Sequence, residues 1–64
     1  MKNNIKELRN AIKLTQGDLA ERIEVSRQTI NAIEKGKFDP SLPTAFRLAA
    51  VFNCTIGELF IYES

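Results

Sequence analysis

Apolar residues recur along this chain at intervals of three and four, which is the spacing of helices that bury one face. Each such run follows a residue type that commonly caps a helix, and these residues are Asn4, Thr15, Ser26, Ser41 and Thr55. The alternation typical of a strand is absent until the last few residues. The pattern therefore predicts an all-α fold of five short helices.

The first three helices have clear start and stop signals. Glu7 and Asp18 stand three residues after the caps Asn4 and Thr15, and this spacing predicts a capping box at both helices. We expect helices over about residues 5–13, from residue 16 to near residue 24, and from residue 27 until Gly36, which suits a left-handed helix end. Their buried faces would carry Ile5, Leu8, Ile12, Leu19, Ala20, Ile23, Ile30 and Ile33.

The fourth helix follows a turn at Asp39 and Pro40, and it tolerates Pro43 in its first turn, where an N–H group is not needed. It is too apolar for one buried stripe, so we expect a central helix that contacts several others. The apolar residues of this helix are Ala45, Phe46, Leu48, Ala49, Val51 and Phe52. Thr55 and Glu58 predict a capping box for a one-turn fifth helix.

The connection between the second and third helices points to function. Only Glu24, Val25 and Ser26 lie between them, so the chain must turn sharply, as in a helix-turn-helix. At about 100° per residue, the third helix places Ser26, Thr29, Ile30 and Ile33 on one face and Arg27, Gln28, Asn31 and Lys35 on the other. The second set contains the side chains that form paired hydrogen bonds with guanine (Arg) and adenine (Gln, Asn).

The chain resembles the phage-repressor and Cro family of helix-turn-helix regulators, also called the XRE family, from Ile5 to Phe60. The residues that carry the resemblance are Thr15, Gln16, Leu19, Ala20, Val25, Ser26, Arg27, Gln28, Thr29, Ile30, Ile33, Glu34, Gly36, Pro40, Ser41 and Leu42. The resemblance implies one lambda-repressor-like domain over residues 1–64, with the helix-turn-helix at about residues 16–35. It is similar in particular to the small stand-alone members of the family, which act as dimers.

The resemblance also implies roles for individual residues. It assigns base reading to Arg27, Gln28 and Asn31, and contacts with the DNA backbone to Gln16, Ser26, Lys35, Lys37 and Phe38. Arg9 and Glu34 match a structural ion pair between the first and third helices. The family most often has Gly where this chain has Glu24, so we expect the turn to hold Glu24 in a left-handed conformation or to rearrange slightly.

We expect a DNA-binding transcriptional repressor that binds an inverted repeat in double-stranded DNA as a homodimer. A dimerisation element at about residues 55–64 would use the apolar side chains of Ile56, Phe60, Ile61 and Tyr62. The β-prone tail would also pair with Lys2 to Asn4, as the resemblance to the small members suggests. The alternative is a protein-interaction module, such as an antitoxin that covers a partner toxin.

Composition excludes several other classes. The 64 residues contain no His and one Cys, so we expect no metal, no cofactor and no enzyme activity, and Cys54 is interpreted as a small filler residue. A redox role for Cys54 would need a basic neighbour, and the local sequence has none. The length leaves no room for a separate ligand-sensing domain, so no small-molecule ligand is expected. Without a signal peptide or an apolar membrane span, the expected location is cytoplasmic.

The net charge of +1 is lower than that of many DNA-binding proteins. The charge is nevertheless unevenly distributed along the chain. Residues 1–37 carry eight basic and five acidic side chains, a net charge of +3, whereas residues 38–64 carry one basic and three acidic side chains, a net charge of −2. Because a local potential steers DNA association, the basic part of the chain is the part expected to face DNA.

Overall fold

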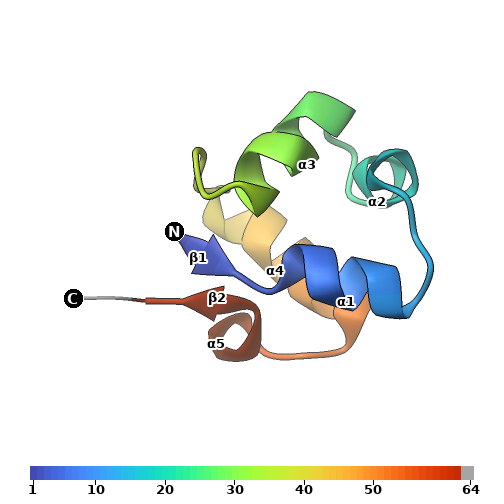
Figure 1. The fold of residues 1–64 in the computed structure, drawn as a ribbon. Coiled ribbons are helices and arrows are strands. Elements are labelled where there is room, and N and C mark those ends of the chain that lie inside the picture. The colour runs from blue at the N-terminus through green and yellow to red at the C-terminus, as the bar shows by residue number, and fades with distance from the viewer. Residues whose placement is uncertain (63–64) are drawn as a thin grey trace.

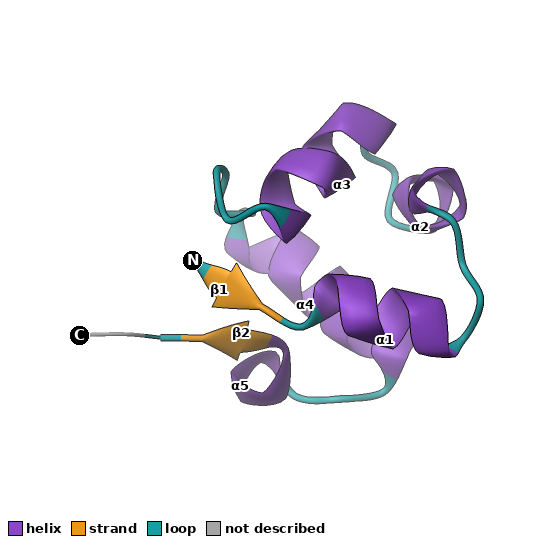
Figure 2. Cartoon of the chain, in the orientation of Figure 1, coloured by secondary structure: helices purple, strands orange, loops and turns teal. Residues whose placement is uncertain are grey.

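The computed structural model describes residues 1–62 and contains five helices and one pair of short strands (Figure 1). The helices are α1 (Ile5–Ala11), α2 (Gln16–Arg22), α3 (Arg27–Glu34), α4 (Leu42–Phe52) and α5 (Ile56–Leu59). The strands β1 (Lys2–Asn3) and β2 (Phe60–Ile61) are antiparallel, with Lys2 opposite Ile61 and Asn3 opposite Phe60. The five predicted helices and the predicted pairing of the two terminal segments are confirmed (Figure 2).

Serine and threonine caps begin four of the helices, as predicted. Thr15 and Thr55 accept a hydrogen bond from the backbone N–H of Asp18 and Glu58, whose carboxylates accept the backbone N–H of Thr15 and Thr55 in return. The hydroxyls of Ser26 and Ser41 accept hydrogen bonds from the backbone of α3 and α4. These bonds satisfy N–H groups that have no partner within the helix.

The predicted cap at Asn4 is wrong. The side chain of Asn4 makes no cap hydrogen bond, and its Nδ2 instead donates to the carbonyl oxygen of Glu58 at 3.1 Å. The preceding residue, Asn3, accepts the backbone N–H of Ile5 through Oδ1 at 3.2 Å. The Asn4 amide therefore bonds the carbonyl of Glu58, which is remote in the sequence, and does not cap the start of α1.

Four helices are followed, within two residues, by a residue with a left-handed backbone. These residues are Lys13, Glu24, Gly36 and Asn53. After α1, the N–H of Lys13 donates to Asn10 and the N–H of Leu14 donates to Arg9, which satisfies two of the last carbonyl groups. The helices α1 and α2 end at Ala11 and Arg22, two residues before the approximate ends predicted near residues 13 and 24. Of the four, Gly36 was the one predicted from its residue type, and Asn53 is also of a type that adopts this conformation readily.

Residues from all five helices and from β2 form one core. Its buried apolar residues are Ile5, Leu19, Ala20, Ile23, Ile30, Ile33, Ala45, Leu48, Ala49, Leu59 and Phe60. Two predicted core residues are exposed, Ile12 by 49% and Phe46 by 59%. Ile12 follows the last residue of α1, and Phe46 lies one turn after Leu42, which is also exposed, so α4 keeps an apolar strip outside the core.

The helix α2 lies at one end of the molecule and α5 at the other, and the C-terminal end of α3 lies beside β1 (Figure 1). The outer face of α2 and α3 and the surface around α5 and β2 are therefore different parts of the molecule. Within residues 1–62, no helix is both long and apolar enough to span a membrane.

Candidate nucleic-acid interface

The turn between α2 and α3 is compact and held by backbone hydrogen bonds. Glu24, with a φ of 60°, donates its N–H to the carbonyl of Glu21, and the N–H of Val25 donates to the carbonyl of Ala20 at 3.0 Å. Val25 packs against the core, and Ser26 then caps α3. The predicted helix-turn-helix is present, and its turn holds Glu24 in the left-handed conformation that glycine adopts most easily.

The two faces of α3 differ in exposure, as the sequence predicts. Ile30 and Ile33 are buried, and Thr29 is half-buried. The polar face points away from the core, with Arg27, Gln28 and Lys35 exposed and Asn31 half-buried. Ser26, which was assigned to the inner face, is exposed, because its hydroxyl caps the start of the helix and bonds the Thr29 hydroxyl at 2.8 Å.

Side chains from α2 and α3 converge on a shallow hollow in the surface. Gln16 is the first residue of α2, and it lines this hollow together with Arg27, Gln28 and Asn31 of α3. The three residues predicted to read bases are thus next to one of the residues predicted to contact phosphate. An adjoining hollow extends from Gln16 and Arg27 along the loop after α1.

A buried ion pair lies beneath this hollow. Arg9 Nε donates to Glu34 Oε2 at 2.7 Å and Arg9 Nη2 donates to Glu34 Oε1 at 3.2 Å. Both side chains are almost fully buried, with exposed fractions of 10% and 5%. Arg9 also donates to the carbonyl of Leu14 at 2.8 Å, so the predicted ion pair joins α1 and α3 and fixes the loop between α1 and α2.

Gln16 connects the buried ion pair to the exposed surface by a hydrogen bond to Glu34. The Nε2 atom of Gln16 donates to Glu34 Oε1 at 3.1 Å and lies 3.5 Å from Asn31 Oδ1. The nitrogen end of the amide must face Glu34, because a carboxylate oxygen is an acceptor only. Glu34 thereby orients Gln16 and, through the longer contact, Asn31. This link was not predictable from the sequence, because it depends on how α1, α2 and α3 pack together.

The loop after α3 presents the remaining predicted backbone contacts. Gly36 donates its N–H to the carbonyl of Ile33 at 2.9 Å, and Lys37 donates to that of Ala32 at 3.0 Å. Lys35 and Lys37 are exposed, and half of the Phe38 side chain, 51%, is exposed. These two hydrogen bonds turn the chain sharply at the end of α3, so the loop begins directly after the helix that carries the polar face.

Hydrogen bonding and burial shift the pKa values of Asp18, Cys54 and Glu58. Backbone hydrogen bonds from Thr15 and Thr55, followed by their hydroxyls, lower the pKa values of Asp18 and Glu58. Burial raises the pKa of the Cys54 thiol, and the charge of Glu58 raises it further. Cys54 packs against the core, which agrees with its interpretation as a filler residue. Within residues 1–62, no group of three or more His, Cys, Asp or Glu side chains is arranged to hold a metal ion.

A second exposed surface is apolar, and the structure only partly matches the predicted dimerisation element. Ile61 and Tyr62 are exposed by 43% and 79%, and Ile56 is half-buried. Phe60 must be reassigned to the core, because it alternates with Ile61 along β2 and is only 8% exposed. The last two residues of the element, 63–64, lie outside the described residues.

Sequence reasoning missed two apolar residues of this surface, Leu42 and Phe46, which are exposed by 64% and 59%. They are four residues apart and share one face of α4. Leu42 and Ile56 line the same apolar hollow between α4 and α5. The excess of apolar residues on α4 was the available signal, and it was interpreted as contact with other helices.

A sharp turn between two helices, with arginine and amide side chains exposed on the second, defines a helix-turn-helix of the DNA-binding class. A model of the helix-turn-helix family HTH_3 matches residues 5–59. This chain belongs to that family of transcriptional regulators, the XRE family, and its fold is lambda-repressor-like.

Relatives and a solved structure agree with this assignment. An uncharacterized HTH-type transcriptional regulator of Methanocaldococcus jannaschii is 57% identical over 63 residues, which cover 98% of this chain and 96% of the relative. The HTH-type transcriptional regulator YgzD of Bacillus subtilis is 41% identical over the same share of each chain. The crystal structure of the restriction-modification controller protein C.AhdI of Aeromonas hydrophila matches with a TM-score of 0.78 and 32% identity, over 88% of this chain and 85% of that chain.

Proposed function

We propose that this protein represses transcription by binding an inverted repeat in double-stranded DNA as a homodimer. The observation that carries this proposal is the polar face of α3. Arg27 and Gln28 are exposed there, and within residues 1–62 their side chains have no hydrogen-bond partner. They are free to form paired hydrogen bonds with guanine and adenine when α3 enters the major groove.

The contacts divide into two kinds. Arg27, Gln28 and Asn31 read bases, and the flanking residues Gln16, Ser26, Lys35, Lys37 and Phe38 contact the DNA backbone. Gln16 Nε2 lies within hydrogen-bond distance of two protein oxygens, so its donation to phosphate replaces the longer contact of 3.5 Å with Asn31. The positive charge of residues 1–37 supports this orientation of the molecule on DNA.

The homodimer forms through the apolar surface at the opposite end of the molecule from α2. Leu42, Phe46, Ile61 and Tyr62 are exposed, and Ile56 is half-buried beside Leu42. A domain this small gains stability by covering such side chains with a second copy. Two α3 helices then reach successive major grooves, about 34–36 Å apart. Occupation of a promoter by this dimer excludes the polymerase, and this is the proposed basis of repression.

Selection of bound sequences from random duplex DNA, at a stated salt concentration, tests the proposal. We expect an inverted repeat with half-sites about 10–10.5 base pairs apart, centre to centre. Arg27→Ala and Gln28→Ala should each weaken binding to the selected site by about 1–3 kcal/mol and relax the preference at one base pair. Selection of no sequence at all, or equal binding by both variants and the wild type, contradicts the proposal.

Lys37→Ala is the matched control for a backbone contact. It should weaken binding to every sequence and reduce the slope of the logarithm of the binding constant against that of the salt concentration by about 1. A loss confined to the selected site would show that Lys37 reads sequence. A protein that binds no DNA and stays monomeric would favour the antitoxin-like alternative, in which another protein covers the exposed apolar side chains.

A further inference from the structure

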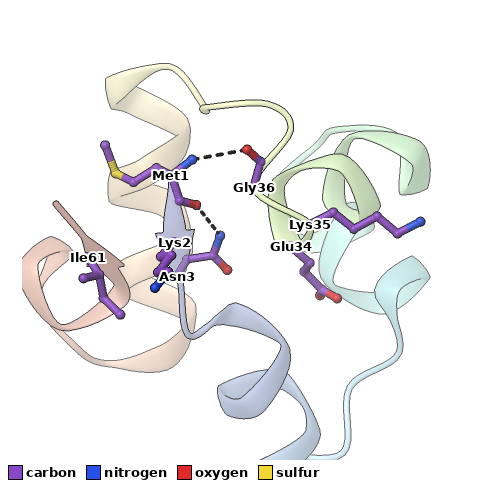
Figure 3. A pocket seen from close by; sticks show the side chains of 7 residues that line it. All are labelled: Met1, Lys2, Asn3, Glu34, Lys35, Gly36 and Ile61. Carbon is purple, nitrogen blue, oxygen red and sulfur yellow. Dashed lines mark hydrogen bonds between the residues drawn. The ribbon is translucent and has the colours of Figure 1, made fainter. Parts of the chain in front are cut away.

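The side chain of Asn3 joins three segments that are far apart in the sequence. Its Nδ2 donates to the carbonyl oxygen of Ile33, in the last turn of α3, at 2.8 Å. Its Oδ1 accepts the N–H of Ile5 at the start of α1. Its backbone belongs to β1, directly opposite Phe60 of β2. Figure 3 shows this side chain reaching from β1 toward the end of α3.

The hydrogen bonds fix the amide in one orientation. The oxygen end faces an N–H group and the nitrogen end faces carbonyl oxygens, those of Ile33 and of Met1 at 3.2 Å. A flipped amide would place like groups against each other. The carbonyl of Ile33 already accepts the N–H of Gly36, so Asn3 supplies its second donor. Asn3 is half-buried, and these bonds are partly shielded from water.

Two features position the strand pair: Phe60 of β2 is buried in the core, and Asn3 of β1 is anchored to α3. Each strand has two residues, and an isolated pair of that length is not stable in water. Met1 adds contacts to Gly36 at 3.3 Å and to Asp39 at 3.0 Å, but both are on the exposed loop after α3. Asn3 bonds the helix itself. The exposed residue Ile61 belongs to β2 and the exposed Tyr62 follows it directly, so the placement of both relative to α3 depends on the same junction.

We propose that Asn3 is a positioning residue that sets which half-site spacing the dimer accepts. The inference rests on the proposed function. In the proposed dimer, one of the connections that set the distance between the two recognition helices runs from the tail through β2 and β1 to the end of α3. When the Asn3 anchor is removed, the tail can take several orientations relative to α3, and each orientation suits a different spacing.

The test uses two variants and a matched control. Asn3→Ala removes the whole amide, and Asn3→Asp keeps the acceptor for Ile5 but loses the donor to Ile33. Asn4→Ala is the control, because Asn4 is also half-buried and donates one hydrogen bond, but to Glu58 of α5 instead of α3. Each protein is titrated onto inverted repeats with identical half-sites and spacers that differ by one base pair, at protein concentrations where sedimentation shows the dimer.

For both Asn3 variants, we expect unchanged affinity for a single half-site and unchanged dimerisation. The discrimination between the best spacer and its neighbours should fall by about fivefold to tenfold, as expected for the loss of one hydrogen bond. Asn4→Ala should keep the wild-type spacing profile. Because a general loss of stability would lower half-site affinity as well, the separation of these two readouts identifies a positioning role.

Two results overturn the inference while leaving the proposed function intact. One is a wild-type spacing profile in both Asn3 variants, and the other is equal broadening in Asn4→Ala. If the wild type itself binds no inverted repeat, the proposed function fails first, and the spacing role fails with it. If Asn3→Ala does not fold, Asn3→Asp, which has the same size as the original residue, provides the comparison.

Discussion

The carboxylate of Glu34 accepts hydrogen bonds from Arg9 and from Gln16, although its side chain is only 5% exposed. A buried carboxylate keeps its charge only when such donors surround it. The Glu34 carboxylate therefore stabilises the fold through its ion pair with Arg9, and it orients Gln16 in the candidate DNA surface. A substitution of Glu34 affects both the stability and this surface.

Removal of the Arg9 charge should unfold most of the protein. Arg9→Met leaves the Glu34 carboxylate buried without its cation, at a cost of about 3–5 kcal/mol. That cost is as large as the stability that one small core supplies, about 3–5 kcal/mol. Urea denaturation followed by far-ultraviolet circular dichroism measures the loss.

The double variant Arg9→Met with Glu34→Leu is the control for the Arg9 prediction. It removes both charges from the interior and should recover most of the lost stability. Its DNA affinity should stay below that of the wild type, because Gln16 loses the oxygen that orients it. If Arg9→Met unfolds at the wild-type urea concentration, the pair contributes nothing to stability and the prediction is wrong.

The capping carboxylates predict how stability depends on pH. Asp18 and Glu58 have lowered pKa values in the folded protein, because the backbone N–H groups of Thr15 and Thr55 bind their charged forms. Their stabilisation is therefore fully present above the ordinary pKa values of 3.8 and 4.5, and it is lost as the pH falls through the lowered values. The Tm should decrease in acid over this range.

The variants Asp18→Asn and Glu58→Gln isolate this effect. Each should have a lower Tm than the wild type at pH 7 and a smaller decrease in Tm between pH 7 and acid, because one titrating group has been removed. Thermal unfolding at a series of pH values measures both quantities. An acid decrease as steep in both variants as in the wild type would assign the pH dependence to other groups.

Among the helices, the turn at Glu24 is the clearest site for increased stability. A residue other than glycine in the left-handed region costs on the order of 1 kcal/mol. Glu24→Gly should therefore raise the stability by up to about 1 kcal/mol, equivalent to about 4–8 °C in Tm for a domain of this size. Glu24→Ala keeps the Cβ atom and should give no such gain. Equal Tm values for the Gly and Ala variants would contradict the explanation.

The helix starts were predictable because capping is local. A hydroxyl at Ser26 or Thr55 meets an N–H three residues later, whatever the rest of the chain does. The left-handed residue Lys13 was not predictable, because its residue type does not indicate such a backbone, whereas Glu24 was expected to be left-handed or to rearrange only because the family most often has Gly there. Asn4 failed as a cap because its partner, Glu58, is remote in the sequence.

In the candidate site, too, local features were predictable from the sequence and contacts between helices were not. The exposure of Arg27 and Gln28 follows from the period of one helix and was predictable. The contact between Gln16 and Glu34 was not, because it requires the relative placement of α2 and α3. Phe46 was assigned to the core for a similar reason, since only the packing of α4 decides which of its apolar residues stay outside.

On the scale of the whole molecule, the exposed apolar residues of α4 should decide the oligomeric state. We expect a dimer at concentrations of tens of micromolar, and a monomer when Leu42→Lys and Phe46→Lys are combined, because charged residues oppose burial in the interface. Sedimentation equilibrium measures both. Ile12→Lys is the control, since Ile12 is also exposed but lies at the end of α1. A monomeric wild type, or equal disruption by Ile12→Lys, contradicts this prediction.

The exposed, unpartnered side chains of Arg27 and Gln28 have a consequence for how such a protein diversifies. Because neither side chain supports the core, both can be replaced without loss of folding, so under the proposed base-reading role a change of operator preference needs no change in the scaffold. Asn31 is different, because it contacts Gln16, and substitutions at these two positions should co-vary.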